Sequence, residues 1–98
     1  MTLEIKKNIN ETTIKIVGRL DIITAPVLEK MINHSASTAK SIVLELSGLE
    51  YISDAGIRAI FDSREKIKAT CSLRIIGVGE GIRGILKSNG FSDALAIN

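Results

Sequence analysis

The first twenty residues alternate between hydrophobic and polar side chains, which is the pattern of strands that keep one face in water. The mostly polar stretch 8–11 interrupts the alternation and predicts a hairpin turn. We therefore expect the chain to open with an antiparallel pair of strands. The hydrophobic residues that carry the pattern are Leu3, Ile5, less regularly Ile9, Ile14 and Ile16.

Hydrophobic residues at helical spacing predict three helices. The first is expected from Thr24-Ala25-Pro26 to near His34, because proline fits the first turn of a helix. The second is expected from about Asp54 to Ala69, and the third ends at Ser88-Asn89-Gly90, where Asn and Gly favour a left-handed cap. The side chains expected to face the core are Val27, Leu28, Met31, Ile32, Ile57, Ile60, Phe61, Ile67, Ile82, Ile85 and Leu86.

Two nearly continuous hydrophobic runs, 41–46 and 72–78, predict strands that are covered on both faces. Residues 47–53 are expected to form a loop, and Ala94–Ile97 either a short edge strand or the start of a last helix. The predicted order is β-β-α-β-α-β-α in a single α/β domain over residues 1–98. Its mixed sheet has four to five strands and carries the helices mainly on one face.

Right-handed crossovers between parallel strands bring the carboxyl ends of those strands to one edge of the sheet. The loops at this edge usually carry the function of an α/β domain. Three segments are expected there, namely 19–21, 47–56 and 77–81. We take this edge as the candidate working surface.

Composition argues against several classes of function. The formal net charge is +2, and the 13 basic and 11 acidic residues are interspersed along the chain, which has few aromatic residues to stack on bases. This distribution disfavours nucleic-acid binding. No hydrophobic run approaches the roughly 20 residues that span a bilayer, and the first residues lack the regions of a signal peptide. We expect a cytoplasmic protein without direct membrane insertion.

The chain offers little for catalysis or metal binding. It has one cysteine and one histidine, and no group of residues has the spacing of a metal site or supplies a nucleophile with a base. The turn Gly77-Val78-Gly79-Glu80-Gly81 follows a strand and precedes a helix, so a phosphate cradle is one interpretation. It lacks the Lys-Ser/Thr of a P-loop, and Glu80 is negative, which favours a tight turn. We expect no enzymatic activity, no metal and no cofactor.

Residues 44–57, Leu-Glu-Leu-Ser-Gly-Leu-Glu-Tyr-Ile-Ser-Asp-Ala-Gly-Ile, carry the most specific motif. A buried strand leads to a Ser-Gly loop, a hydroxyl and acidic pair, a small residue, a glycine and an aliphatic residue that opens a helix. Here the chain resembles the STAS family, typified by anti-sigma factor antagonists. The turn Gly18-Arg19-Leu20-Asp21 with Thr24-Ala25-Pro26, and the closing segment from Leu86 to Ile97, agree with that family in order and spacing. The resemblance covers almost the whole chain and implies the STAS fold.

The resemblance gives position 54 a particular meaning. In that family, the hydroxyl residue two places before the motif glycine is phosphorylated by a serine kinase that is itself the anti-sigma factor. Asp54 stands at this position, and its single charge is expected to imitate part of the charge of about −1.5 to −2 on a phosphoserine. Two other interpretations remain open. Asp54 is an ordinary N-cap that accepts from the N–H of Gly56 or Ile57, or Ser53 is the phosphoacceptor instead.

The resemblance implies an anti-sigma factor antagonist in bacterial transcription regulation. It would occupy an anti-sigma factor of the GHKL serine-kinase type and so release a sigma factor, as a monomer or weak dimer. The alternatives are a STAS subunit of a transport or stress-signalling complex, and a small nucleotide-binding module at the turn 77–81. The residues expected to contact the partner are Arg19, Asp21, Thr24, Ser53, Asp54, Ala55, Gly56, Ile57 and Arg58.

Overall fold

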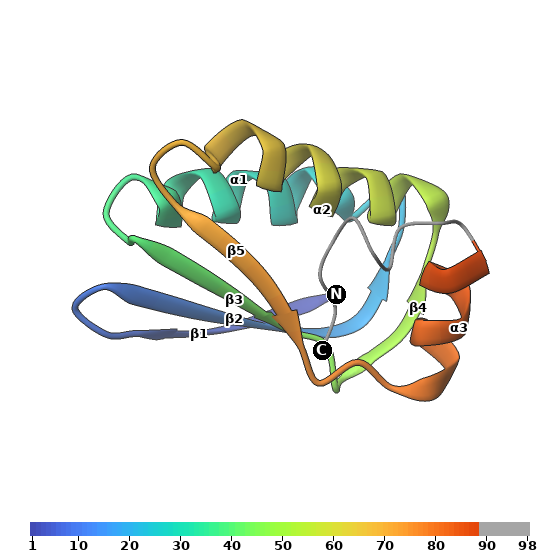
Figure 1. The fold of residues 1–98 in the computed structure, drawn as a ribbon. Coiled ribbons are helices and arrows are strands. Elements are labelled where there is room, and N and C mark those ends of the chain that lie inside the picture. The colour runs from blue at the N-terminus through green and yellow to red at the C-terminus, as the bar shows by residue number, and fades with distance from the viewer. Residues whose placement is uncertain (89–98) are drawn as a thin grey trace.

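The computed structural model of the chain describes residues 1–88, which form five strands and three helices (Figure 1). In chain order these are β1 (Thr2–Lys7), β2 (Glu11–Leu20), α1 (Ala25–Ala36), β3 (Ser41–Glu45), β4 (Leu49–Ile52), α2 (Asp54–Ile67), β5 (Ser72–Ile76) and α3 (Glu80–Ser88). The predicted fold class and order are confirmed, with β4 as an additional short strand. The predictions for 89–90 and 94–97 lie outside the described residues.

The sheet is mixed, as predicted. β1 and β2 form the expected antiparallel pair, with Ile5 opposite Ile14. β3 pairs in parallel with β2 on one side and with β5 on the other, which gives the order β1-β2-β3-β5. β4 pairs in parallel with the last residues of β2. The carboxyl ends of β2 and β4 therefore lie next to each other.

β2 changes partner along its length. Its first half, Glu11–Lys15, pairs with β3, and its end, Gly18–Leu20, pairs with β4. The register shifts between Gly18 and Arg19, and Gly18 has a φ of +99°, which residues with a Cβ seldom adopt. Figure 1 shows that the last part of β2 curves away from β3 and runs beside β4.

The prediction of a loop over 47–53 is wrong for residues 49–52, which form β4. This strand buries its two ends, Leu49 and Ile52, and exposes Glu50 and Tyr51 between them, so it lacks the alternation that marks a strand. It forms because β2 extends past β3 and offers backbone N–H and C=O groups that need partners. Such pairing is decided by the length of a neighbouring strand and not by the local sequence.

α1 and α2 lie side by side on one face of the sheet, and α3 lies against β4 (Figure 1). The core fills the space between the two long helices and this face of the sheet. Its largest fully buried side chains are Ile14, Ile16, Leu20, Leu28, Ile32, Ile42, Leu44, Leu46, Ile52, Ile57, Ile60 and Ile75.

Most of the side chains predicted to face the core do so, but two hydrophobic residues are placed differently. Ile9 lies in the β1–β2 turn and is 93% exposed, while Val27, predicted to be buried, is 55% exposed. The buried face of α1 is formed by Leu28, Ile32 and Ser35, so Val27 lies one position away from it.

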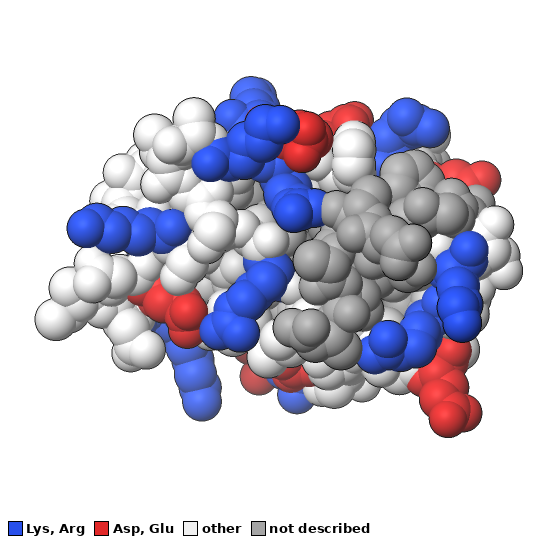
Figure 2. Space-filling model, in the orientation of Figure 1, with Lys and Arg blue, Asp and Glu red and all other residues white. Residues whose placement is uncertain are grey.

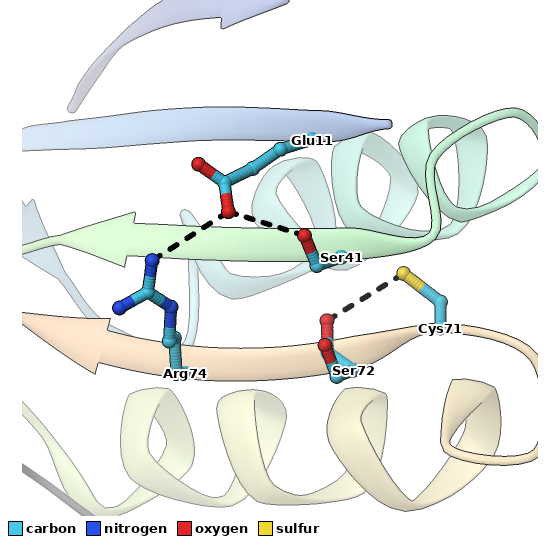
Figure 3. A network of polar contacts seen from close by, with 5 residues as sticks. All are labelled: Glu11, Ser41, Cys71, Ser72 and Arg74. Carbon is cyan, nitrogen blue, oxygen red and sulfur yellow. Dashed lines mark hydrogen bonds and ion pairs between the residues drawn. The ribbon is translucent and has the colours of Figure 1, made fainter. Parts of the chain in front are cut away.

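The other face of the sheet is polar. Glu11 on β2 accepts a hydrogen bond from Ser41 Oγ on β3 at 3.2 Å, and its Oε2 lies 3.5 Å from Nη2 of Arg74 on β5 (Figure 3). An ion pair this exposed contributes less than about 1 kcal/mol.

Nearby, Cys71 is buried and its thiol donates to the Ser72 carbonyl at 3.6 Å, and burial raises the pKa of this thiol. Charges of both signs are spread over the side of the molecule shown in Figure 2.

Candidate protein-binding site

The turn between β2 and α1 is held by reciprocal hydrogen bonds between Asp21 and Thr24. Asp21 Oδ1 accepts from the backbone N–H groups of Ile23 (3.0 Å) and Thr24 (3.1 Å). In return, Thr24 Oγ1 accepts from the Asp21 N–H at 2.9 Å and donates to the Arg19 carbonyl at 3.0 Å. These contacts fix the backbone of residues 21–24 and the entry into α1.

The same contacts keep Asp21 negatively charged. The Thr24 backbone N–H lowers the pKa of the Asp21 carboxyl most, and the Thr24 hydroxyl, the Ile23 N–H and the charge of Arg19 act in the same direction. Partial desolvation opposes them and raises the pKa, but the net direction is downward. The turn therefore carries a negative charge at lower pH than an ordinary aspartate would.

α2 begins at a serine cap. Ser53 has an extended backbone, and its Oγ accepts from the Gly56 N–H at 3.2 Å. The interpretation of Asp54 as the N-cap is therefore wrong, because Ser53 fills that position. Asp54 is the first residue of the helix, exposed at the end where the helix dipole is positive. A serine cap of this kind is worth about 0.5–2 kcal/mol.

Gly56 and Ile57 lie beneath the surface of the site. Ile57 is fully buried, and a Cβ at Gly56 would lie 2.8 Å from the Leu20 carbonyl oxygen and 2.9 Å from Leu20 Cγ. The missing side chain thus lets the first turn of α2 approach the end of β2. These two predicted contact residues position the site and do not form its surface.

An open hollow of about 580 Å³ lies where the ends of β2 and β4 meet the first turn of α2. Five of the predicted contact residues line it together, although 32 positions of the chain separate Asp21 from Ser53. α3 closes one side with Ile85. The complete lining is Arg19, Asp21, Ile22, Tyr51, Ile52, Ser53, Asp54, Ala55 and Ile85.

The remaining predicted contact residues lie close by but do not line the hollow. Thr24 stabilises the turn through its hydrogen bonds to Asp21. Arg58 is exposed on α2, one helical turn beyond Asp54. Both positions agree with a surface centred on the first turn of α2.

The lining combines a hydrophobic wall with charges. The Arg19 guanidinium carbon lies 4.3 Å from the centre of the Tyr51 ring, which places a cation over an aromatic face. The carboxylates of Asp21 and Asp54 stand among the hydrophobic side chains of Ile22 and Ile85. A surface of this kind suits a protein side chain that is part apolar and part charged.

Three exposed aliphatic residues, of which one lines the hollow, were not predicted as functional. Ile22 is 73% exposed, Ile23 is 79% exposed, and Val27, in the first turn of α1, is 55% exposed. We call these three residues the aliphatic patch. Hydrophobic residues are usually assigned to the core, and only the position of Ile22 and Ile23 between Asp21 and Thr24, inside a turn, could have marked them as exposed.

The turn 77–81 does not line the hollow. Gly77 has a φ of +69°, and a Cβ on it would overlap Glu45 Oε1, so packing accounts for this glycine. The Glu45 carboxylate also accepts from the Ser47 N–H at 2.7 Å, and hydrogen bonding by the Ser47 side chain and backbone lowers its pKa. Residues 77–79 form a three-residue connection between β5 and α3 without a regular turn.

Within residues 1–88, no three His, Cys, Asp or Glu side chains are grouped in a way that could hold a metal ion. None of the helices in this part of the chain has the length and hydrophobicity to span a bilayer.

Comparison with protein families matches the STAS domain over residues 1–98. The chain belongs to the STAS-domain family. The resemblance found in residues 18–26, 44–57 and 86–97 is thereby confirmed. A comparison with curated proteins gives no match.

Solved structures with the same fold include proteins of two kinds. This STAS domain superposes on an anti-sigma factor antagonist from Mycobacterium paratuberculosis with a TM-score of 0.85 and 21% identity, covering 98% of this chain and 83% of that one. A putative anti-sigma factor antagonist from Thermotoga maritima gives 0.84 and 16%, covering 97% and 84%. A sulfate transporter family protein from Wolinella succinogenes gives 0.73 and 25%, covering 85% and 69%.

Proposed function

We propose that this STAS domain is an anti-sigma factor antagonist of the cytoplasm, which acts by binding and not by catalysis. It binds an anti-sigma factor of the GHKL serine-kinase type and thereby releases the sigma factor that this kinase holds. The observation that carries the proposal is the position of Asp54, exposed on the first turn of α2 and lining the hollow beside Arg19 and Asp21. The likeness in fold to two anti-sigma factor antagonists supports it.

Asp54 makes the binding constitutive in this proposal. A phosphoserine at a helix N-terminus gains from the helix dipole and repels an acidic partner, and it can be added or removed. Asp54 carries about half of that charge permanently and has no hydroxyl to accept a phosphate. The neighbouring Ser53 Oγ is engaged in capping the helix, and the residue is half-buried. The domain is therefore not switched at position 54.

The proposal is tested with the wild-type domain and the variants Asp54→Ser and Asp54→Ala as baits in native lysate. Asp62→Ala serves as a matched control, because Asp62 is also an exposed aspartate on α2, two turns farther along. We expect wild type and Asp62→Ala to capture a GHKL-type kinase. With this kinase and ATP, Asp54→Ser should gain one phosphate by mass spectrometry, whereas wild type and Asp54→Ala should gain none.

Two results would contradict the proposal. Phosphate on Ser53 of the wild-type domain would show that the switch has moved by one residue and has not been lost. Recovery of transport or stress-signalling components, without a kinase, would assign the domain to another circuit. A transport complex is the second candidate, since the sulfate transporter family protein has the same fold at 25% identity.

The nucleotide-binding alternative finds less support, because packing against Glu45 accounts for Gly77 and the turn 77–81 does not line the hollow. A thermal-shift measurement with ATP and GTP at millimolar concentration checks it, since a bound ligand must stabilise the folded state. We expect no shift in the melting temperature.

A further inference from the structure

Exposed large hydrophobic side chains are concentrated at one place on this domain. Among the described residues, five such side chains are exposed. Two of them, Ile22 and Tyr51, line the hollow, and Ile23 and Val27 follow Ile22 within five positions of the chain. The fifth, Ile9, lies in the β1–β2 turn, at the opposite end of the ten-residue strand β2. None of these four side chains is buried in the core, so folding does not require them to lie at one end of the domain.

The aliphatic patch is presented on a rigid backbone. The hydrogen bonds of Asp21 Oδ1 to the N–H groups of Ile23 and Thr24 fix the turn from which Ile22 and Ile23 project. Val27 follows within the first turns of α1. A surface that is already ordered loses little conformational entropy when it binds, so its contacts translate efficiently into affinity.

The size and surroundings of the patch indicate what covers it. The exposed fractions of its three side chains correspond to about 300–400 Å² of apolar surface, which is below the roughly 800 Å² per partner of a stable interface. Two copies of this chain would not be held together by the patch alone. Asp21 and Asp54 beside the patch are balanced by Arg19 and Arg58, so there is no excess of basic side chains to attract anionic lipid headgroups. A different protein, whose contact continues from the patch over the hollow, fits both facts.

We propose that the aliphatic patch is the main source of affinity for the protein partner, which covers Ile22, Ile23 and Val27 with a hydrophobic segment. Ile22 belongs to the patch and also lines the hollow, so one partner surface can contact both. A basic side chain on that segment would face Asp21 and Asp54, which fix orientation and specificity more than affinity. The inference rests on the proposed function only for the identity of the partner as an anti-sigma factor.

The test compares Ile23→Ala and Ile22→Ala with Ile9→Ala, which removes the same atoms from an isoleucine that is even more exposed but distant. Each buried methylene is worth about fourfold in Kd, and Ile→Ala removes three carbons. We expect Kd for the purified partner from the pull-down to rise at least about tenfold in Ile22→Ala and Ile23→Ala and to stay unchanged in Ile9→Ala. Kd of the wild type should change less than about threefold between roughly 50 and 500 mM salt.

The outcomes separate this inference from the proposed function. If the captured partner is a transport protein and Ile23→Ala weakens it tenfold, the proposed function fails and the patch inference holds. If a kinase-type anti-sigma factor binds Ile22→Ala and Ile23→Ala as tightly as Ile9→Ala, the patch inference is overturned while the function stands. The patch inference is also overturned if the wild type binds vesicles of anionic phospholipid and Ile23→Ala does not. It is overturned if the wild type self-associates and Ile23→Ala does not, or if no protein is captured.

Discussion

Replacing Gly56 with alanine should destabilise the domain, although alanine favours a helix. The new Cβ would meet the Leu20 carbonyl oxygen at 2.8 Å, Leu20 Cγ at 2.9 Å and Ile52 Cγ1 at 3.1 Å. The first of these atoms belongs to the backbone and cannot rotate away. Relieving such overlap costs typically about 1–3 kcal/mol, and the helix propensity of alanine returns up to about 1 kcal/mol. Because one of the overlapped atoms is in the backbone, the cost lies in the upper half of this range, and we expect a net loss of about 1–2 kcal/mol.

The control is Gly81→Ala, because Gly81 is also in the first turn of a helix, but among the described residues no atom outside its own helix and chain neighbours lies within 4 Å of the added Cβ. Here only the higher helix propensity of alanine acts, so the free energy of unfolding should stay the same or rise by up to about 1 kcal/mol. Chemical unfolding followed by circular dichroism gives both free energies. In thermal unfolding, the loss in Gly56→Ala corresponds to a fall in Tm of about 4–16 °C.

If the free energy of unfolding is unchanged or raised in Gly56→Ala, then α2 and β2 do leave room for a side chain at this residue, and the prediction is refuted. A stable variant with weakened partner binding would show instead that the helix had shifted and taken Ser53 and Asp54 with it. The two measurements on one variant thus test whether Gly56 positions the site.

Two further predictions concern polar groups. The Ser35 hydroxyl is buried and has no hydrogen-bond partner among residues 1–88, so Ser35→Ala should raise the free energy of unfolding by about 1 kcal/mol. A lower free energy of unfolding in urea denaturation would contradict this. The pKa of Asp21 is lowered in the folded state, so its stabilising effect is complete above its ordinary value of 3.8 and is lost as the pH falls through the lower, folded pKa. Unfolding measured from neutral to acidic pH should therefore depend less on pH in Asp21→Asn, and equal pH dependence in both proteins would refute the assignment.

The sequence was informative wherever a local pattern has one structural solution. The alternation around Ile14 gives a strand with one buried face, and the hydrophobic spacing through Ile57 and Ile60 gives an amphipathic helix, whatever the rest of the chain does. The residues 18–26 and 44–57 also sufficed for the family, and the order of the elements predicted that both segments end at one edge of the sheet. Arg19, Asp21 and Asp54 were predicted as neighbours for this reason.

Tertiary structure alone decided the features that depend on an unseen neighbour. β4 forms because β2 extends past the end of β3, and the four residues of β4 do not alternate between buried and exposed positions. Ser53, rather than Asp54, caps α2, because the cap is chosen by the backbone angles at which the chain leaves β4. Ile22, Ile23 and Val27 have the composition of core residues, yet a turn closed by Asp21 and the orientation of α1 leave them in water. Hydrophobicity states what a side chain gains from burial, but only the packed fold determines which side chains can be buried.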